Sequence, residues 1–230
     1  MLIGIDASRA AGSQRTGTEN YSYYLIHALL REDGVNRYRL YLQDAPAEGF
    51  LPHNERVEWR VMPWPRLWTH LRLSWEMRAA PPDVLFVPSH VLPIIHPRAS
   101  VVTVHDLGYL RFPEAHTRAA RWYLDLSTRW NARRARRVVV DSQATADDLV
   151  AAYGTPRGKI RLAYPAGAEG MAPEGDPARL AAVRERYGTG ERYFLYVGTL
   201  QPRKNLLLLV RAFGALVAAG RMPEDARLVL

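Results

Sequence analysis

Short apolar segments alternate with longer amphipathic segments along most of this 230-residue sequence. The run 2–6 has the length and apolar content of a buried strand, whereas 18–30 carries apolar residues at helical spacing. The same alternation continues, with strands expected at 39–42, 57–61, 83–87, 101–104, 138–140 and 160–164 and helices at 67–78, 114–134 and 142–153. It predicts an α/β domain with a doubly wound parallel sheet, since 83–87 and 101–104 are apolar enough for central parallel strands.

The composition changes after residue 164, where proline and glycine replace core-forming residues. We interpret 167–177 as a linker that follows a first domain at 1–166. Beyond the linker we expect a helix at 178–187, a strand at 193–197, a helix at 205–218 and a strand at 227–230. One and a half βα units leave a sheet face uncovered, so 178–230 is expected to be the truncated beginning of a second Rossmann-like domain.

Composition and charge narrow the classes of protein to consider. A hydrophobic content of 48% argues against a disordered chain, and the absence of cysteine excludes disulfides and cysteine-ligated metal sites. The sequence shows neither a signal-peptide pattern nor an apolar run of about 18 residues. We therefore expect a cytoplasmic protein, with peripheral contact at the inner face of the membrane as an alternative. The net charge of +8 fits a nucleic-acid or membrane partner, but solvated arginines are the simpler explanation.

The loop 6–19 joins the first expected strand to the first helix, where ligands of open α/β sheets commonly bind. Gly17 permits close approach of a ligand to the backbone, and the helix N-terminus beside Thr18 and Glu19 favours an anion. The loop has neither a G-x-G-x-x-G nor a Walker A pattern. Taken alone, a glycine required by a tight turn is the favoured explanation for Gly17.

His105 and Asp106 directly follow the strand expected at 101–104. Polar residues at the carboxyl end of a central strand face the crevice in which such sheets bind ligands. A histidine there can donate to a substrate hydroxyl or carry a proton. A histidine satisfied by neighbouring loop backbone is an equally weighted alternative.

The most informative segment is 193–205, in which a strand ends at Gly198 and two cations, Arg203 and Lys204, precede the next helix. Cations are disfavoured at a helix N-terminus. A bound phosphate offsets that repulsion and accepts charge-assisted hydrogen bonds. Two solvated charges are the alternative interpretation.

Taken together, these segments resemble family 4 glycosyltransferases, whose two Rossmann-like domains form the GT-B fold. The resemblance is carried by residues 17–20, 102–107, 140–142 and 196–205, and it covers nearly the whole chain. It implies retaining, metal-independent transfer of a sugar from a nucleotide-diphosphate sugar to a glycan or lipid-linked acceptor, with mannose-type donors mildly preferred. It implies no cofactor apart from this donor substrate.

The resemblance also implies roles for single residues. Lys204 matches the lysine that binds the donor diphosphate, Gly17 the glycine whose backbone faces the donor phosphates, and His105 the histidine that contacts the transferred sugar. Thr199 stands where many relatives have arginine, and we assign the charge role of that arginine to Arg203. The family's paired acidic motif lies downstream of residue 230, so we expect the 230-residue chain alone to be inactive.

The segment Arg118–Arg137 is rich in arginine and has aromatic residues interleaved. We expect Trp122, Leu126 and Trp130 to pack on the sheet while the arginines are solvated. Peripheral contact with an anionic membrane through this helix is the alternative. The competing functions are a basic nucleic-acid-binding protein, which is disfavoured because no known binding motif is present, and a non-catalytic nucleotide- or sugar-binding module.

Overall fold

The computed structural model describes residues 1–12, 15–51, 54–89, 91–167 and 171–230. Residues 13 and 14 of the loop 6–19, and residues 168–170 of the segment interpreted as a linker, lie outside the described residues. The chain divides into two units, Met1–Ala166 and Gly167–Leu230, and each is described by itself.

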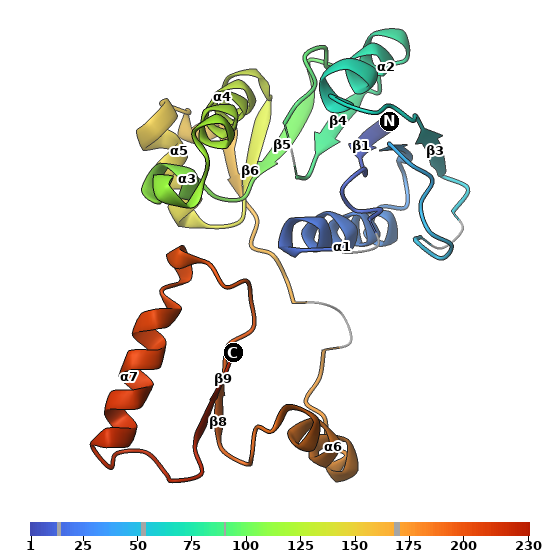
Figure 1. Ribbon diagram of the computed structural model, residues 1–230. Coiled ribbons are helices and arrows are strands. Elements are labelled where there is room, and N and C mark those ends of the chain that lie inside the picture. Colours follow the sequence, from blue (N-terminus) through green and yellow to red (C-terminus); the bar gives the residue numbers. More distant parts are fainter. Residues whose placement is uncertain (13–14, 52–53, 90, 168–170) are drawn as a thin grey trace. The chain divides into compact units, whose positions relative to one another are not determined.

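A seven-stranded sheet forms the centre of the first unit (Figure 1). All of its pairings are parallel, in the order β3-β2-β1-β4-β5-β6-β7. The strand order runs outward in opposite directions from β1 and β4, which confirms the predicted doubly wound parallel sheet. The strands are β1 Leu2–Asp6, β2 Arg37–Leu42, β3 Val57–Val61, β4 Val84–Val87, β5 Ser100–Val104, β6 Arg137–Val140 and β7 Ile160–Leu162.

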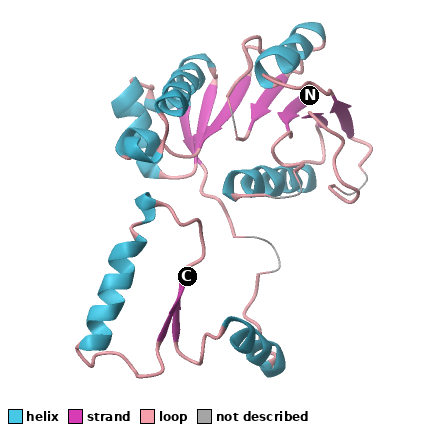
Figure 2. Cartoon of the chain, viewed as in Figure 1, coloured by secondary structure: helices cyan, strands magenta, loops and turns pink. Residues whose placement is uncertain are grey.

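Helices cover both faces of this sheet, which Figure 2 shows in magenta among cyan helices. In Figure 1, α1 lies below the strands and α2 above them. The α-helices of this unit are α1 Gly17–Glu32, α2 Ser74–Ala79, α3 Gly108–Arg111, α4 Arg118–Arg134 and α5 Gln143–Tyr153. Shorter turns are the π-helical η1 Thr69–Leu73 and the 3-10 turns η2 Pro113–Ala115 and η3 Arg157–Lys159.

The two faces have separate hydrophobic cores because side chains alternate along each strand. Leu40 and Leu42 of β2 pack with Ile26 of α1, whereas Tyr41 packs with Met77 of α2 on the other face. The same alternation holds in β4, where Phe86 joins the α1 core and its two neighbours join the other. β4 buries both faces, which is why Val84–Val87 is a continuous apolar run in the sequence.

Gly4 in β1 marks a close approach between the sheet and the segment before β4. A Cβ at this position would lie 2.7 Å from Pro82 Cγ and 2.7 Å from Tyr41 Cε2. Any larger residue must displace one of these rings. Glycine is therefore required here by packing rather than by backbone conformation.

Two expected helices differ from the structure. The helix expected at 114–134 is interrupted, because His116 is extended and Thr117 caps a new helix by accepting a hydrogen bond from Ala120 N at 3.2 Å. The helix expected at 67–78 begins two residues later, after Leu67 with a φ of 55°, and its first turn is π-helical. The expected strands 160–164 and 193–197 are each shorter by two residues at their carboxyl ends.

The expected apolar stripe of α4 is wrong for two of its three residues. Trp122 is 68% exposed and Leu126 is 43% exposed, and only Trp130 packs against the core. The buried face instead carries Leu124, Thr128, Asn131 and Ala132. At about 100° per residue, Trp122 lies half a turn away from Asn131, so the two cannot share a face. Small residues near the end of α4 set which side faces the sheet.

The second unit contains α6 Pro177–Tyr187, β8 Tyr193–Leu195, the 3-10 turn η4 Pro202–Lys204, α7 Leu206–Ala218 and β9 Arg227–Val229. β8 and β9 pair in parallel, and α7 is the connection between them. This is one βαβ unit, and the apolar side chains of Phe194, Leu195 and Leu207 are exposed.

Candidate functional site

The carboxyl ends of the parallel strands meet at one edge of the sheet, and the polar residues of the first unit gather there. Asp6 ends β1, His105 follows β5, and Asp141 follows β6. This edge is where open α/β sheets bind ligands, close to the point where the strand order changes direction.

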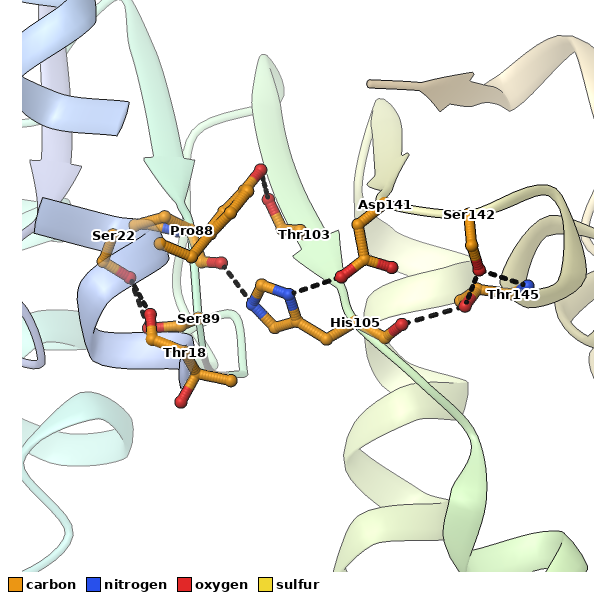
Figure 3. A network of polar contacts seen from close by, with 10 residues as sticks. Thr18, Ser22, Pro88, Ser89, Thr103, His105, Asp141, Ser142 and Thr145 are labelled. Atoms are coloured by element: carbon orange, nitrogen blue, oxygen red, sulfur yellow. Dashed lines mark hydrogen bonds and ion pairs between the residues drawn. The ribbon is translucent and has the colours of Figure 1, made fainter. Parts of the chain in front are cut away.

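His105 is held by contacts from three sides (Figure 3). Its Nδ1 lies 3.1 Å from Asp141 Oδ2, and its Nε2 lies 3.1 Å from the carbonyl oxygen of Pro88. The ring of Tyr21 packs edge-on against it with centroids 4.7 Å apart. A carbonyl oxygen only accepts, so Nε2 carries the proton of this hydrogen bond.

Asp141 is a site residue to which the sequence analysis assigned no role. It belongs to the segment 140–142, and its strand β6 is the neighbour of β5 in the sheet. The next residue, Ser142, caps α5 by accepting from Thr145 N at 3.1 Å. Thr145 Oγ1 in turn donates to the main-chain oxygen of His105 at 2.8 Å. The helix start thus fixes both the backbone and the side chain of His105.

A cavity of about 440 Å³ lies beside this histidine. It brings together Thr18, His105 and Asp106 from the predicted site, and it adds Arg9 and Tyr123, which the sequence analysis missed. Arg9 lies three residues after β1, a position that only the folded loop brings to His105. The sides of the cavity come from α1, β5 and α4.

Glu19 has a structural role in this site. Its carboxylate accepts a hydrogen bond from Thr16 N at 3.0 Å and another from the Thr16 hydroxyl, forming a capping box at the start of α1. Hydrogen bonds from Thr16 hold the pKa of Glu19 below its usual value. Glu19 also lies 3.8 Å from Arg9.

Gly17 is the first residue of α1, next to the capping Thr16. A Cβ there would meet nothing within 4 Å, and its φ lies outside the left-handed region. The favoured explanation of a glycine required by a tight turn is therefore wrong. Gly17 instead presents an open stretch of backbone at the N-terminus of a helix, which is a favourable place for an anion.

Two further carboxylates organise loops at this edge. Asp106 Oδ1 accepts from Gly108 N at 2.8 Å and so begins α3. Asp6 Oδ1 accepts from Ser8 N at 3.1 Å and from Ser8 Oγ at 2.6 Å. Burial raises the pKa of Asp6, because its charged form is removed from water.

In the second unit, Arg203 and Lys204 lie in the 3-10 turn η4 and not in the first turn of α7. Asn205 separates them from α7 in a left-handed conformation with a φ of 50°. Arg203 Nε donates to Gln201 Oε1 at 2.8 Å, and both cations are exposed. Both cations therefore precede α7, as the sequence analysis expected, with Asn205 between them and the helix.

Thr199 lies in the turn that follows β8. Its main-chain oxygen accepts from the Tyr196 hydroxyl at 3.0 Å, and a Cβ at Gly198 would lie 2.8 Å from that hydroxyl. Gly198 therefore lets the tyrosine fold back over the turn. His105 and Lys204 belong to different units, and each site is described within its own unit.

The described part of the chain contains no group of three His, Asp or Glu side chains placed to hold a metal ion. None of the helices among the described residues is long and apolar enough to cross a bilayer.

Comparisons with known proteins point to one family. Residues 15–166 match Glycosyltransferase Family 4. The O-antigen chain mannosyltransferase B of Escherichia coli is 27% identical over 152 residues, which are 66% of this chain and 39% of that protein.

Solved structures of Anabaena Alr3699/HepE share the fold. The complex with UDP-glucose has a TM-score of 0.58 at 14% identity, and the complex with UDP and glucose has a TM-score of 0.58 at 16% identity. Each match covers 99% of this chain and 59% of that chain. The chain therefore spans less than two thirds of the length of these relatives, and its fold is of the expected GT-B type.

Proposed function

The chain belongs to Glycosyltransferase Family 4, and we propose that it forms the acceptor-side domain and the start of the donor-side domain of a glycosyltransferase. The enzyme would move a sugar from a nucleotide-diphosphate sugar to a glycan or lipid-linked acceptor, with retention of anomeric configuration. The observation that supports this proposal is the placement of His105, which contacts Asp141 and Pro88 and lines a cavity at the edge of the sheet. A mannose-type donor is preferred because the Escherichia coli relative is named a mannosyltransferase.

We assign the reacting groups as follows. The bond between the anomeric carbon and the diphosphate breaks with its electron pair leaving on the diphosphate. The acceptor hydroxyl oxygen bonds to that carbon from the same face, and its proton passes to the departing diphosphate. His105 lies in the acceptor-side unit, where it contacts the transferred sugar. Lys204, with Arg203 beside it, neutralises the charge that grows on the leaving diphosphate, and the open backbone at Gly17 adds N–H donors. These groups take the place of a metal ion.

The role of Lys204 is tested in the complete protein with nucleotide-mannose and nucleotide-glucose donors and a panel of glycan acceptors. Lys204→Ala should lower turnover by about 100-fold or more, as loss of a preorganised charge contact does. Arg211→Ala is the matched control, because Arg211 is an exposed cation on α7. Near-normal turnover of Lys204→Ala rejects the assigned role, and an inverted product by nuclear magnetic resonance rejects retention.

The 230-residue chain should not catalyse transfer by itself. Among the described residues, its second unit supplies a two-stranded sheet and the exposed cations of η4. Sugar transfer by the purified 230-residue chain would contradict this proposal.

A second proposal concerns location: a cytoplasmic protein in peripheral contact with the inner face of an anionic membrane through Arg118–Arg137. Trp122 and Tyr123 are exposed on α4 among arginines, which is the composition of interfacial helices. Co-sedimentation with phosphatidylglycerol vesicles at low and moderate salt tests it, with Trp122→Glu as the variant expected to lose binding. A chain that stays in the supernatant at both salt concentrations removes the proposal.

A further inference from the structure

An apolar groove of about 710 Å³ opens on the first unit, away from His105. Its apolar lining residues are Trp64, Leu71, Trp75, Ile94 and Ile95, all of them exposed. Exposed apolar surface of this extent in a soluble domain marks a place where an apolar partner binds.

The groove has fixed walls. One wall is the π-helical turn η1, in which Leu73 N donates to Trp68 O at 2.9 Å, five residues back. Turns of this kind are frequent at functional sites. The opposite wall is tied to the first, because Ile95 N donates to Ser74 Oγ at 3.3 Å.

The helix behind the groove is also anchored. The buried carboxylate of Glu76 lies 2.9 Å from Arg60 Nε and 3.2 Å from an Arg72 nitrogen, which joins α2 to β3. Leu71 and Trp75 are four residues apart and point outward along the same side. The helix that lines the groove is therefore held in place by ion pairs to the sheet.

A polar cavity of about 410 Å³ shares lining residues both with this groove and with the cavity beside His105. His70 lines both the groove and the polar cavity, and its Nε2 lies 3.2 Å from the Tyr123 hydroxyl. Arg9 and Tyr123 line both the polar cavity and the cavity beside His105. Gln43, which also lines the polar cavity, donates to the carbonyl oxygen of Trp64 at 2.9 Å.

The molecule thus presents three environments in sequence. The cavity beside His105 is followed by a polar cavity that offers a guanidinium, an amide and a hydroxyl, and then by an apolar groove. A bilayer surface alone accounts for the groove but not for the polar cavity that shares lining residues with it. An amphipathic molecule accounts for all three.

We propose that this groove binds the hydrocarbon chain of a lipid-linked acceptor whose saccharide occupies the polar cavity between Arg9, Gln43 and His70. The inference rests on the proposed glycosyltransferase function and narrows its acceptor to the lipid-linked class. The hydrocarbon chain holds the saccharide so that its free end faces the cavity beside His105. Burial lowers the pKa of His70, so the residue between the two environments is an uncharged hydrogen-bonding group.

The test uses the 230-residue chain and alkyl maltosides kept below their critical micelle concentrations, with binding measured by isothermal titration calorimetry. Dodecyl maltoside should bind at least roughly tenfold more tightly than octyl maltoside, since each methylene removed from water strengthens binding by up to about fourfold. Maltose serves as the probe without a chain and should bind more weakly than either.

Variants locate the binding site. Ile94→Glu places a charge in the groove at a residue that is 56% exposed, and it should abolish the dependence on chain length. Leu71→Ser is the milder variant and should weaken dodecyl maltoside binding by about tenfold even if Ile94→Glu fails to fold. Trp122→Glu is the matched control, because Trp122 is exposed and apolar but lies outside the groove, so it should bind as the native chain does.

Three results would overturn the inference: equal binding of octyl and dodecyl maltoside, equal loss of binding in Trp122→Glu, or binding to vesicles without binding to the monomeric maltosides. Transfer assays with the complete protein separate this inference from the proposed function. Equal turnover on free and alkyl-linked saccharides refutes the lipid-linked acceptor and leaves the glycosyltransferase standing. Chain-length-dependent binding without transfer to any acceptor supports the groove and refutes the enzyme.

Discussion

Replacing Glu76 with glutamine should destabilise the first unit by a predictable amount. The side chain of Glu76 is 6% exposed, and its carboxylate meets Arg60 and Arg72 at 2.9 and 3.2 Å. A hydrogen bond to a charged group contributes about 1.5–3 kcal/mol to stability. Arg60 and Arg72 keep 45% and 26% of their side chains exposed, so solvent reduces each contact to about 0.5–1 kcal/mol.

Loss of both contacts in Glu76→Gln should lower the free energy of unfolding by about 1–2 kcal/mol. For a chain of this size, that loss lowers the melting temperature by about 2–8 °C. Urea unfolding followed by tryptophan fluorescence measures it in the intact chain. The signal reports the first unit alone, because all six tryptophans lie within it: Trp59, Trp64, Trp68, Trp75, Trp122 and Trp130.

The control is Glu32→Gln, the same chemical change at an exposed residue that pairs with Arg31. It should change stability by less than about 0.5 kcal/mol. Combining Glu76→Gln with Arg60→Met should cost less than the two single changes added together. A Glu76→Gln chain as stable as the native chain, with no coupling to Arg60, would refute the view that this carboxylate anchors α2 to β3.

Three further predictions address the site and the core. Asp141→Asn keeps the size of the side chain but removes the charge that faces His105 Nδ1, so turnover of the complete protein should fall about 10- to 100-fold; turnover equal to that of the native protein would show that Asp141 does not position His105. Burial raises the pKa of Asp6, so the Asp6 carboxyl loses its proton at a lower pH in the unfolded chain than in the folded chain. The native chain should therefore lose stability relative to Asp6→Asn as the pH rises above 3.8 toward neutrality. Urea unfolding of both chains from pH 3 to 7 measures the difference in their free energies of unfolding, and a difference that does not change with pH contradicts the prediction. Gly4→Ala should cost about 1–3 kcal/mol of stability, because its Cβ would lie 2.7 Å from Pro82 Cγ; a melting temperature equal to that of the native chain would disprove this close packing.

The parallel, doubly wound sheet could be predicted from the sequence because its central strands bury both faces. Residues 84–87 are apolar throughout and 101–104 are apolar apart from Thr103, and the structure has them side by side in β4 and β5. The face of α4 that packs against the sheet could not be predicted in the same way, because two sides of that helix carry large apolar residues. The choice between Trp122 and Leu124 depends on which side fits against the sheet, and that is a tertiary property.

The candidate site was predictable only in part, for a similar reason. His105 and Asp106 are recognisable because they follow a strand, but the partner of His105 is 36 residues away. Asp141 becomes its neighbour because β6 pairs with β5, and a reader of the sequence must know the strand order to pair them. The groove could not be predicted because its two walls, 64–75 and 94–95, are far apart in the sequence and meet in the fold, where Ile95 N donates to Ser74 Oγ.

The strand order reverses between β1 and β4, and the two sides of this reversal carry different parts of the unit. Residues on one side, from Gln43 to Trp75, shape the polar cavity and part of the groove, while His105 and Asp141 belong to strands on the other side. The polar cavity and the cavity beside His105 share Arg9 and Tyr123. We therefore predict that acceptor preference can be changed separately from the chemistry at His105. Grafting 62–79 from a relative should exchange the acceptor while His105 and Asp141 keep their contact.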